Sequence, residues 1–586
     1  MLRILRYLKP KEWLFAAISL VFIIAQVYLD LRLPETMSQI TMLVQTPGSA
    51  IGEIWRAGGF MLLCALGSLL CAFSIGGFAA HIAASFSRRL RSLLFDAVAA
   101  FSMGELNHFS IPSLITRSTN DITQIQTLLT IALQLVVKAP ITAAWAITKI
   151  IGKGYEWSLA TGIVVVILVI MVTILMAALM PKFMRMQILA DNLTRVTREN
   201  LTGLRVVRAF NAEHYQEEKF NAANKDLTDT HLFTNRAMII MSPVMNILMS
   251  GLSLSIYWLG AYMIEAAAIG DKLVLFSNMV VFSQYATQVI MSFMMLAMIF
   301  VILPRASVSA KRVNEVLDTE AAIKDGEATA GLAGVSGELA FRHVSFQYPD
   351  AAERVLEDIS FTAGKGETVA FIGSTGSGKT TLVNLIARFF DVTEGEILVD
   401  GVDVRDYKLE ALYDKIAYVP QSAILFRGTV CSNVAYGRNG ADPLAEDEVR
   451  WAAAIAQAAD FVEDMEGGYQ ASVAQSGANL SGGQKQRLSI ARAVYKRPEI
   501  YIFDDSFSAL DYRTDRALRK ALKTATAGIT SLIVAQRIGT IMDADQIIVL
   551  DEGRIAGIGT HAELLRTCAV YKEIAVSQLS EEELAS

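Results

Sequence analysis

A glycine-rich stretch from Gly373 to Thr380 offers the clearest chemistry in the sequence. It reads Gly-Ser-Thr-Gly-Ser-Gly-Lys-Thr and matches the P-loop pattern in full. It follows the apolar segment 368–372, which we expect to be a strand, and it opens an expected helix at Thr380. Glycines let backbone N–H groups converge on phosphate oxygens, and a helix N-terminus adds partial positive charge. The stretch therefore predicts a site for the phosphates of a nucleotide.

The side chains of this loop have separate expected tasks. Lys379 is expected to reach the β- and γ-phosphates, and the hydroxyl of Thr380 is expected to ligate Mg²⁺. The nucleotide-binding residues predicted from the loop are Gly373, Ser374, Thr375, Gly376, Ser377, Gly378, Lys379, Thr380 and Thr381.

Two later segments carry groups suited to the same chemistry. Segment 500–504 reads as a buried apolar strand that ends in Asp504, a carboxylate placed to help hold Mg²⁺. Segment 480–484, Leu-Ser-Gly-Gly-Gln, precedes a helical run, in which Ser481 suits a helix cap and the glycines let backbone N–H groups approach an anion. Taken alone, each segment also fits an ordinary strand end or a capped helix start.

The composition indicates more than one kind of domain. Of the 586 residues, 53% are hydrophobic and 19% are charged, whereas an average soluble protein carries about 25% charged residues. The apolar excess lies in the first half of the chain. The formal net charge of −6 gives no support for nucleic-acid binding, which usually shows as a basic face. Neither a disulfide nor a structural zinc is expected from the spacing of Cys64, Cys71, Cys431 and Cys568.

Six apolar segments approach or exceed the roughly 20 residues that a hydrocarbon core of about 30 Å demands. Their approximate bounds are 13–33, 58–86, 128–151, 158–181, 237–265 and 273–303. The longest links, 87–127 and 182–236, are rich in arginine and lysine, so the positive-inside rule places them and the N-terminus in the cytoplasm. These links contain few glycines, and we expect them to continue the helices out of the membrane.

The second half of the chain reads as a soluble domain. Residues 316–337 lack periodicity and form the expected linker, after which strands and helices alternate as in an α/β nucleotide-binding domain. The predicted fold is therefore a multi-domain membrane protein. It has an all-α transmembrane domain of six helices with long cytoplasmic extensions (1–315), a linker (316–337) and an α/β P-loop ATPase domain (338–586).

The order of the motifs carries a family resemblance. The P-loop, Gln421, the Leu480–Gln484 signature and Asp504 resemble in this order the nucleotide-binding domain of an ABC transporter, which binds ATP with Mg²⁺. The six spans with long second and fourth links resemble the fused half-transporters of the exporter type, and the likeness covers essentially the whole chain. Segments 101–121 and 199–210 resemble the coupling-helix regions of those exporters.

The resemblance implies roles for further residues. Tyr348 matches the aromatic residue that stacks on adenine, Gln421 matches the residue that senses Mg²⁺ and the γ-phosphate, and Asp511 ends the loop that crosses the dimer interface. In this family two ATPase domains pair head to tail, so each ATP lies between the P-loop of one and the signature of the other. The implied signature contacts are Ser481, Gly482, Gly483 and Gln484, and the implied Mg²⁺ ligands are Thr380, Gln421 and Asp504.

Two residues depart from the family pattern where hydrolysis occurs. The family's catalytic Glu is replaced by Asp505, and its switch His is replaced by Gln536. The shorter side chain sets the carboxylate back by up to about 1.5 Å, and a misplacement of about 1 Å can cost on the order of 10²-fold in rate. Gln536 can donate a hydrogen bond but carries neither a proton to transfer nor a charge. ATP binding is expected to survive, and hydrolysis at this site is expected to be slow.

An intact signature beside a weakened catalytic pair predicts an asymmetric assembly. We predict one half of a heterodimeric, ATP-driven exporter in the cytoplasmic (inner) membrane, whose partner half-transporter supplies the catalytic Glu and the switch His. Its predicted substrates are amphipathic compounds, either drug-like or lipid-like. The alternatives are a regulatory, essentially non-hydrolysing subunit that gates a partner, a peptide- or lipid-exporter half, and a scaffold or channel-like member of the superfamily.

Several residues within the spans could line a transport path. Asp30 and Arg32 are expected to snorkel or form gate contacts near an interface, whereas Gln284 and Gln288 share a helical face and are candidates for the path itself. Lys138 is a further intramembrane charge. Methionines suit varied apolar ligands, although ordinary helix packing also explains those in spans five and six: Met238, Met241, Met245, Met249, Met291, Met294, Met295 and Met298.

Overall fold

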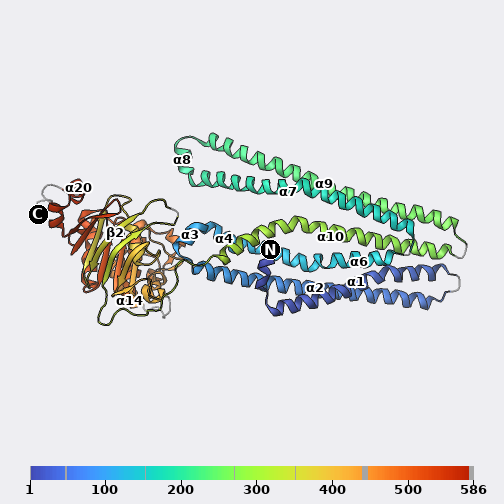
Figure 1. The fold of residues 1–586 in the computed structure, drawn as a ribbon, viewed down its shortest axis with the longest axis horizontal. Coiled ribbons are helices and arrows are strands. Elements are labelled where there is room, and N and C mark those ends of the chain that lie inside the picture. The colour runs from blue at the N-terminus through green and yellow to red at the C-terminus, as the bar shows by residue number, and fades with distance from the viewer. Residues whose placement is uncertain are drawn as a thin grey trace. The chain divides into compact units, whose positions relative to one another are not determined.

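The computed structural model describes residues 2–46, 49–151, 153–268, 271–349, 351–438 and 446–579. They fall into two compact units, and each is described by itself. The first unit comprises residues 1–99 and 112–319, and the second comprises residues 100–111 and 320–586. The first unit is helical, and the second holds the strands (Figure 1).

Long helices that run side by side build the first unit, with α1 packed along α2 and α7 along α9 (Figure 1). Its helices are η1 (Leu2–Tyr7), α1 (Pro10–Gln45), α2 (Ile51–Ala99), α4 (Ile111–Thr116), α5 (Ile122–Ile131), α6 (Lys138–Ile150), α7 (Tyr155–Thr202), α8 (Leu204–Ala209), α9 (Glu213–Ala266) and α10 (Lys272–Asp318). Among the described residues, six helical stretches are long and apolar enough to cross a membrane: 10–45, 51–99, 111–150, 155–202, 213–266 and 272–296. The prediction of six spans is confirmed.

The third stretch is interrupted by two π-helical turns, η2 (Arg117–Asp121) and η3 (Ala132–Val136). A π-helical turn carries an extra residue and re-aims the side chains that follow it, and such turns are frequent at functional sites. Because η3 ends two residues before Lys138, it sets the direction in which that lysine leaves the helix.

The long links between the spans are largely helical, as their amino-acid sequence predicted. α2 continues to Ala99 and α7 continues to Thr202, and each is followed by a short helix. The first of these, α3 (Met103–Phe109), is capped by Ser102, whose Oγ accepts a hydrogen bond from the backbone N–H of Gly104 at 3.1 Å. Residues 100–111 group with the second unit, whereas α8 groups with the first.

The core of the first unit is held by large side chains. Trp157 is fully buried, and its ring centroid lies 5.5 Å from that of Phe282. Gly260 permits close helix approach there, because a Cβ at this position would lie 2.4 Å from Sδ of Met279. The hydroxyl of Tyr285 donates to the backbone oxygen of Leu31 at 2.9 Å and ties α10 to α1.

The described residues of the second unit form three sheets. The strands of the four-stranded antiparallel sheet lie in the order β2 (Leu356–Ala363), β1 (Leu339–Phe346), β4 (Glu394–Val399) and β5 (Val402–Asp403). The six-stranded sheet has the order β12 (Arg554–Gly559), β11 (Gln546–Asp551), β3 (Thr368–Gly373), β10 (Thr530–Val534), β9 (Ile500–Asp504) and β6 (Ile416–Val419). The third pairs β7 (Gly428–Thr429) with β8 (Ser472–Val473).

Helices complete the second unit: α11 (Lys379–Ile386), α12 (Leu409–Lys415), α13 (Val430–Ala435), α14 (Glu446–Ile455), α15 (Ala459–Glu463), α16 (Gly482–Lys496), α17 (Tyr512–Ala525), α18 (Ile538–Ile541), α19 (His561–Thr567) and α20 (Ala569–Gln578). The single-turn helices are η4 (Tyr436–Arg438), η5 (Gly468–Gln470) and η6 (Gln475–Gly477). One buried apolar cluster joins the antiparallel sheet to β3 and α11, and another fills the helices around α16.

Strand order determines where the site forms. In the six-stranded sheet, β3, β10, β9, β6 and β11 are parallel, and β12 alone is antiparallel. The carboxyl ends of β3, β10, β9 and β6 therefore meet at one edge, where ligands bind in open α/β sheets.

The expected linker, residues 316–337, has more regular structure than its amino-acid sequence indicated. α10 continues to Asp318, and the following chain lies along the second unit. The backbone N–H of Gly326 donates to the oxygen of Tyr407 at 3.0 Å, and that of Leu332 donates to the oxygen of Asp400 at 2.9 Å. Small residues allow this approach, since a Cβ on Gly326 would lie 2.0 Å from the oxygen of Asp406.

Candidate nucleotide-binding site

The P-loop connects β3 to α11, which begins at Lys379, one residue before the predicted helix start. Gly376 and Gly378 have φ angles of +88° and +93°, in the left-handed region that favours glycine. A Cβ on Gly378 would also lie 2.6 Å from Cδ2 of Leu356. Ser374, Thr375 and Gly376 are exposed, so this part of the loop is open to a phosphate at the start of the helix.

Lys379 folds back over the loop. Its Nζ donates to the backbone oxygens of Gly373 at 2.9 Å and Ser374 at 2.7 Å, and to Oγ of Ser377 at 3.3 Å. Burial lowers the pKa of Lys379, and the nearby carboxylates of Asp505 and Asp504 oppose that shift. The ammonium is therefore held over the loop by groups that a phosphate can replace.

Asp504 ends β9 and is 2% exposed. Its Oδ1 accepts from the hydroxyl of Thr380 at 3.1 Å, and its Oδ2 accepts from the hydroxyl of Tyr418 at 3.1 Å. Burial raises the pKa of Asp504, and the hydrogen bonds from both hydroxyls oppose that shift.

The facing oxygens of Thr380 and Asp504 fit Mg²⁺, which prefers hard oxygen ligands and commonly takes one or two from the protein and others from phosphates. Among the described residues, no group of three or more His, Cys, Asp or Glu side chains could hold a metal without such help. When bound, Mg²⁺ would neutralise charge that develops on the phosphates.

Asp505 sits in a cluster of amides. The Nε2 atoms of Gln536 and Gln421 both donate to its Oδ2, at 2.8 Å and 3.1 Å. The backbone at Asp505 has φ +46°, and the residue is 8% exposed. Burial raises the pKa of Asp505, and the hydrogen bond from Gln421 opposes that shift. The structure thus brings the two predicted catalytic residues into direct contact.

Tyr348 lies beside the end of the P-loop. Its hydroxyl is 2.9 Å from Oγ1 of Thr381. Its ring meets those of Phe346 and Phe390 edge-on, with centroids 4.8 Å and 5.2 Å away. These contacts fix the ring of a half-buried residue beside the phosphate loop.

The signature begins α16 with a reciprocal cap. Oγ of Ser481 accepts from the backbone N–H of Gln484 at 3.3 Å, and Oε1 of Gln484 accepts from the N–H of Ser481 at 2.9 Å. Gly483 lies against the loop 508–511, since a Cβ there would be 3.4 Å from the oxygen of Ala509. Asp511 in turn caps α17 by accepting from the N–H of Thr514 at 3.0 Å.

Among the described residues, no hydrogen bond joins the signature to the P-loop of the same chain. The geometry therefore divides the predicted residues into two groups. The P-loop, Asp504, Asp505, Gln421 and Gln536 form one cluster, and the signature with Asp511 forms another.

Sequence reasoning missed two residues of the site. Tyr418, which holds Asp504, lies near the end of β6 and could have been found from the strand that leads to Gln421. Gln578 of α20 holds the segment after β10: its Nε2 donates to the oxygen of Gln536 at 2.9 Å, and its Oε1 accepts from the N–H of Ile538 at 2.8 Å. No local signal marks Gln578.

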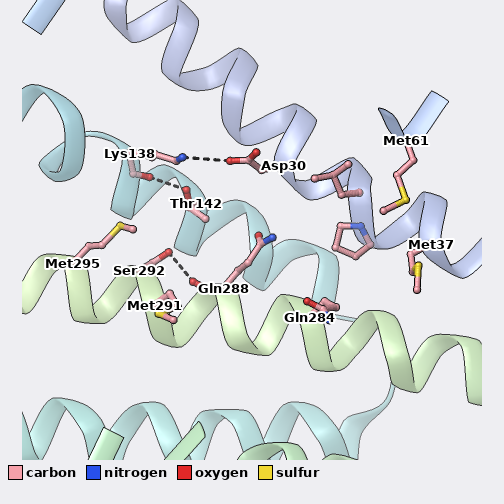
Figure 2. Close-up of a pocket in the computed structure, with 12 residues that line it drawn as sticks. Asp30, Met37, Met61, Lys138, Thr142, Gln284, Gln288, Met291, Ser292 and Met295 are labelled. Atoms are coloured by element: carbon pink, nitrogen blue, oxygen red, sulfur yellow. Dashed lines mark hydrogen bonds and ion pairs between the residues drawn. The ribbon is translucent and has the colours of Figure 1, made fainter. Parts of the chain in front are cut away.

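A second candidate site is a pocket of about 480 Å³ among α1, α2, α6 and α10 of the first unit (Figure 2). Its lining residues are Asp30, Leu33, Pro34, Met37, Met61, Lys138, Thr142, Gln284, Gln288, Met291, Ser292 and Met295. Gln284 and Gln288, the candidates for the transport path, line this pocket, and so do Met291 and Met295 of span six. The side chain of Met298 lies outside the described residues.

Asp30 and Arg32, both expected to snorkel or to form gate contacts, leave the helix in different directions. Asp30 turns into the pocket, where its Oδ2 lies 3.3 Å from Nζ of Lys138. Arg32 leaves the helix in another direction and pairs with Glu35 at 3.0 Å and with the hydroxyl of Tyr28. The difference arises because the two side chains are two residues apart, and positions so spaced do not share a helix face.

A P-loop, a strand-end carboxylate and a capped signature in one α/β unit, joined to six spans, define an ATP-binding half-transporter. The model of the ABC transporter transmembrane region matches residues 16–293, and the ABC transporter model matches residues 356–508. This chain belongs to the ABC transporter family.

Relatives and a solved structure agree over nearly the full length. An uncharacterized ABC transporter ATP-binding protein of Mycobacterium tuberculosis is 39% identical over 98% of this chain and 97% of its own. An ATP-dependent lipid A-core flippase of Pseudomonas aeruginosa is 32% identical over 88% and 83% of the two chains. The structure of a bacterial Atm1-family ABC exporter with ATP bound matches with a TM-score of 0.81 and 25% identity, over 98% of this chain and 100% of that one. The chain is a fused half-transporter with the exporter fold.

Proposed function

We propose that this chain is one half of an ATP-driven exporter of amphipathic compounds, and that it holds ATP at a site that hydrolyses it slowly. The contact between Gln536 and Asp505 at 2.8 Å carries the proposal. A neutral amide stands where a histidine would carry charge or a proton, and it engages a carboxylate one methylene shorter than Glu. ATP remains bound because the P-loop, Asp504 and Tyr348 retain the groups that binding needs.

The partner follows from the signature. Ser481 caps α16 and leaves the glycines at the helix start, which suits an anion. A signature of this form serves the ATP of an opposite subunit, and a competent site there needs a P-loop, a Glu and a His from a different chain. The preferred assembly is therefore a heterodimer with one slow and one fast site.

The substrate class rests on the pocket and on the relatives. Four methionines line a cavity that also holds a lysine and an aspartate, which suits an amphipathic molecule. The Pseudomonas aeruginosa relative is named as a flippase for lipid A-core, so the lipid-like class is favoured over the drug-like class. The basic links orient the six spans so that the ATPase domain and the N-terminus lie in the cytoplasm and the protein spans the inner membrane.

Two single variants of this chain, each purified in complex with the partner, test the proposed heterodimer. Lys379→Ala disables ATP binding at this chain's own P-loop. Gly482→Asp places a negative charge at the signature. A Cβ at Gly482 meets nothing within 4 Å, and an acidic residue in the first helical turn favours the helix dipole, so α16 should still form.

We expect Gly482→Asp to abolish at least nine-tenths of the ATPase rate of the complex, and Lys379→Ala to leave most of that rate intact. Equal loss in both variants would show two equivalent sites and contradict the heterodimer. Flux measured in the same vesicles separates an exporter from a regulatory subunit, because a regulator would give partner-dependent ATPase activity without coupled transport.

A further inference from the structure

A lysine and an aspartate face one another inside the transmembrane pocket. Nζ of Lys138 and Oδ2 of Asp30 are 3.3 Å apart, and the two side chains remain 22% and 27% exposed. Ionisable residues between membrane helices are costly, and they usually mark a path or a binding site. Neither residue belongs to the nucleotide-binding machinery.

Both charged groups of the pair keep unused hydrogen-bonding capacity. Asp30 accepts from Oγ of Ser68 at 2.5 Å with its Oδ1 and from Lys138 with its Oδ2. The ammonium of Lys138 has three donors, and among the described residues its only hydrogen bond is the long one to Asp30. Each oxygen of Asp30 already accepts one hydrogen bond, and Lys138 keeps two donors that can bind an anionic group on a guest.

Gln288 adds an acceptor to the same pocket. Its Oε1 is buried and has no hydrogen-bond partner among the described residues. Figure 2 shows its side chain extending from α10 toward the helix that carries Lys138 and Thr142. An unsatisfied buried acceptor costs free energy, and a hydroxyl on the guest would relieve that cost. A phosphate monoester group in its singly protonated form offers both the anion and the hydroxyl.

The rest of the lining is apolar. In Figure 2, Met37 and Met61 lie at the opposite end of the view from Lys138, and Met291 and Met295 lie on α10. Methionine side chains are flexible and polarizable, so they adapt to chains of varied shape. A volume of about 480 Å³ lies within the ~300–1,000 Å³ typical of ligand pockets.

We infer that this pocket binds amphipaths through a phosphate monoester head group, with Lys138 as the residue that selects the anion. The π-helical turn η3 aims Lys138 into the pocket, Gln288 accepts from the head group, and the methionines contact the apolar chain. The inference rests on the proposed export of amphipathic compounds and specifies the class of head group.

The test uses the full-length chain, free of nucleotide, in nanodiscs of a zwitterionic lipid. Three fluorescent probes share one fluorophore and one alkyl chain and end in a phosphate, a trimethylammonium or a glucoside. We expect the alkyl phosphate to bind at least tenfold more tightly than the trimethylammonium probe. Lys138→Gln should weaken the alkyl phosphate about tenfold, since a charge-assisted hydrogen bond is lost, and should change glucoside binding less than threefold.

Lys149→Gln is the matched control. Lys149 lies on the same helix, pairs with Glu35 of α1 at 2.7 Å and does not line the pocket, so this variant should bind the alkyl phosphate like the wild type. Lys138→Arg keeps the charge and should stay within threefold of the wild type. Asp30→Asn releases Lys138 and should strengthen phosphate binding.

The inference is overturned if the phosphate and trimethylammonium probes bind alike, or if Lys138→Gln weakens all three probes equally, which would show that Lys138 only supports the helices. Because binding is measured without nucleotide, a failure of the asymmetric ATPase model would leave a measured head-group preference standing. Conversely, an asymmetric ATPase without any head-group preference would overturn this inference alone.

Discussion

Adjacent carboxylates in the second unit take different partners. Asp504 faces the hydroxyls of Thr380 and Tyr418, whereas Asp505 faces the amides of Gln421 and Gln536. Hydroxyl and carboxylate oxygens are groups that Mg²⁺ accepts. Amides around the second carboxylate hold it in place without offering a proton. At the scale of single residues, this contrast is the basis for our proposal that the site binds ATP and hydrolyses it slowly.

The ring of Tyr348 gives a residue-scale prediction. Tyr348→Ala should weaken binding of a fluorescent ATP analogue to the full-length chain by about tenfold or more, since stacking on a base is worth ~1–3 kcal/mol. Tyr348→Phe loses only the hydroxyl contact with Thr381 and should bind within about twofold of the wild type. Equal losses in the two variants would place the hydroxyl, and not the ring face, at the nucleotide.

The sequence identified many residues of the ATP site because their motifs are local. Gly373–Thr380 and Ile500–Asp504 each specify a strand end, and parallel pairing brings those ends together. The pair of Lys138 and Asp30 could not be predicted, because no sequence motif marks either residue and they are 108 positions apart. Their meeting depends on the rotation of two helices and on the π-helical turn η3, which the sequence pattern did not reveal.

At the scale of elements, the helices and strands follow the apolar patterns closely, and the differences have physical causes. The expected linker 316–337 lies partly along the second unit. The sequence did not predict this, because the backbone contacts near Gly326 and Gly331 leave no hydrophobic periodicity. α20 approaches the segment after β10 through Gln578, an exposed polar residue that resembles any solvated glutamine in the sequence.

Gln578 supplies a prediction about this element. Gln578→Leu removes two hydrogen bonds to the backbone of Gln536 and Ile538, each worth about 1 kcal/mol. Amide hydrogen exchange at Ile538 should therefore accelerate about tenfold or more in the variant. The neighbouring change Ser577→Ala, on the same exposed turn, should leave that exchange rate unchanged. An unaltered rate in both variants would show that α20 does not restrain the segment.

We expect the pairing of α19 and α20 to depend on pH. Nδ1 of His561 lies 2.7 Å from the hydroxyl of Tyr571. Burial lowers the pKa of His561 below 6.5, and burial raises the pKa of Tyr571 to about 12, so a neutral imidazole faces a protonated phenol. A lowered pKa means that this contribution to stability is present above pH 6.5 and is lost as the pH falls through the lowered value.

We therefore expect the melting temperature of the second unit to decrease when the pH is lowered from 7.5 to 5. The decrease should be smaller in His561→Gln. Scanning fluorimetry of the full-length chain at both values measures this difference. His343→Gln, at an exposed histidine whose side chain is 84% accessible, serves as the control. An identical pH dependence in all three proteins would contradict the account of α19 and α20.

At the scale of the whole molecule, each of the two units carries one candidate binding site. The second unit carries the candidate nucleotide site at the carboxyl ends of β3, β9, β10 and β6, and the first unit holds a charged, methionine-lined pocket. The sequence predicted the six-span helical fold, the α/β nucleotide-binding fold and the family. The partner that completes the transporter is proposed from two substituted residues, Asp505 and Gln536, and from an intact signature.

The central claim is tested most directly by the steady-state ATPase rate of the purified full-length chain alone, measured beside the Asp505→Glu/Gln536→His variant. The account predicts a wild-type rate well below about 1 s⁻¹, the lower end of typical enzyme turnover, and a gain of at least tenfold in the variant. A wild-type chain that turns over at several molecules per second, with no gain from the two substitutions, would contradict it.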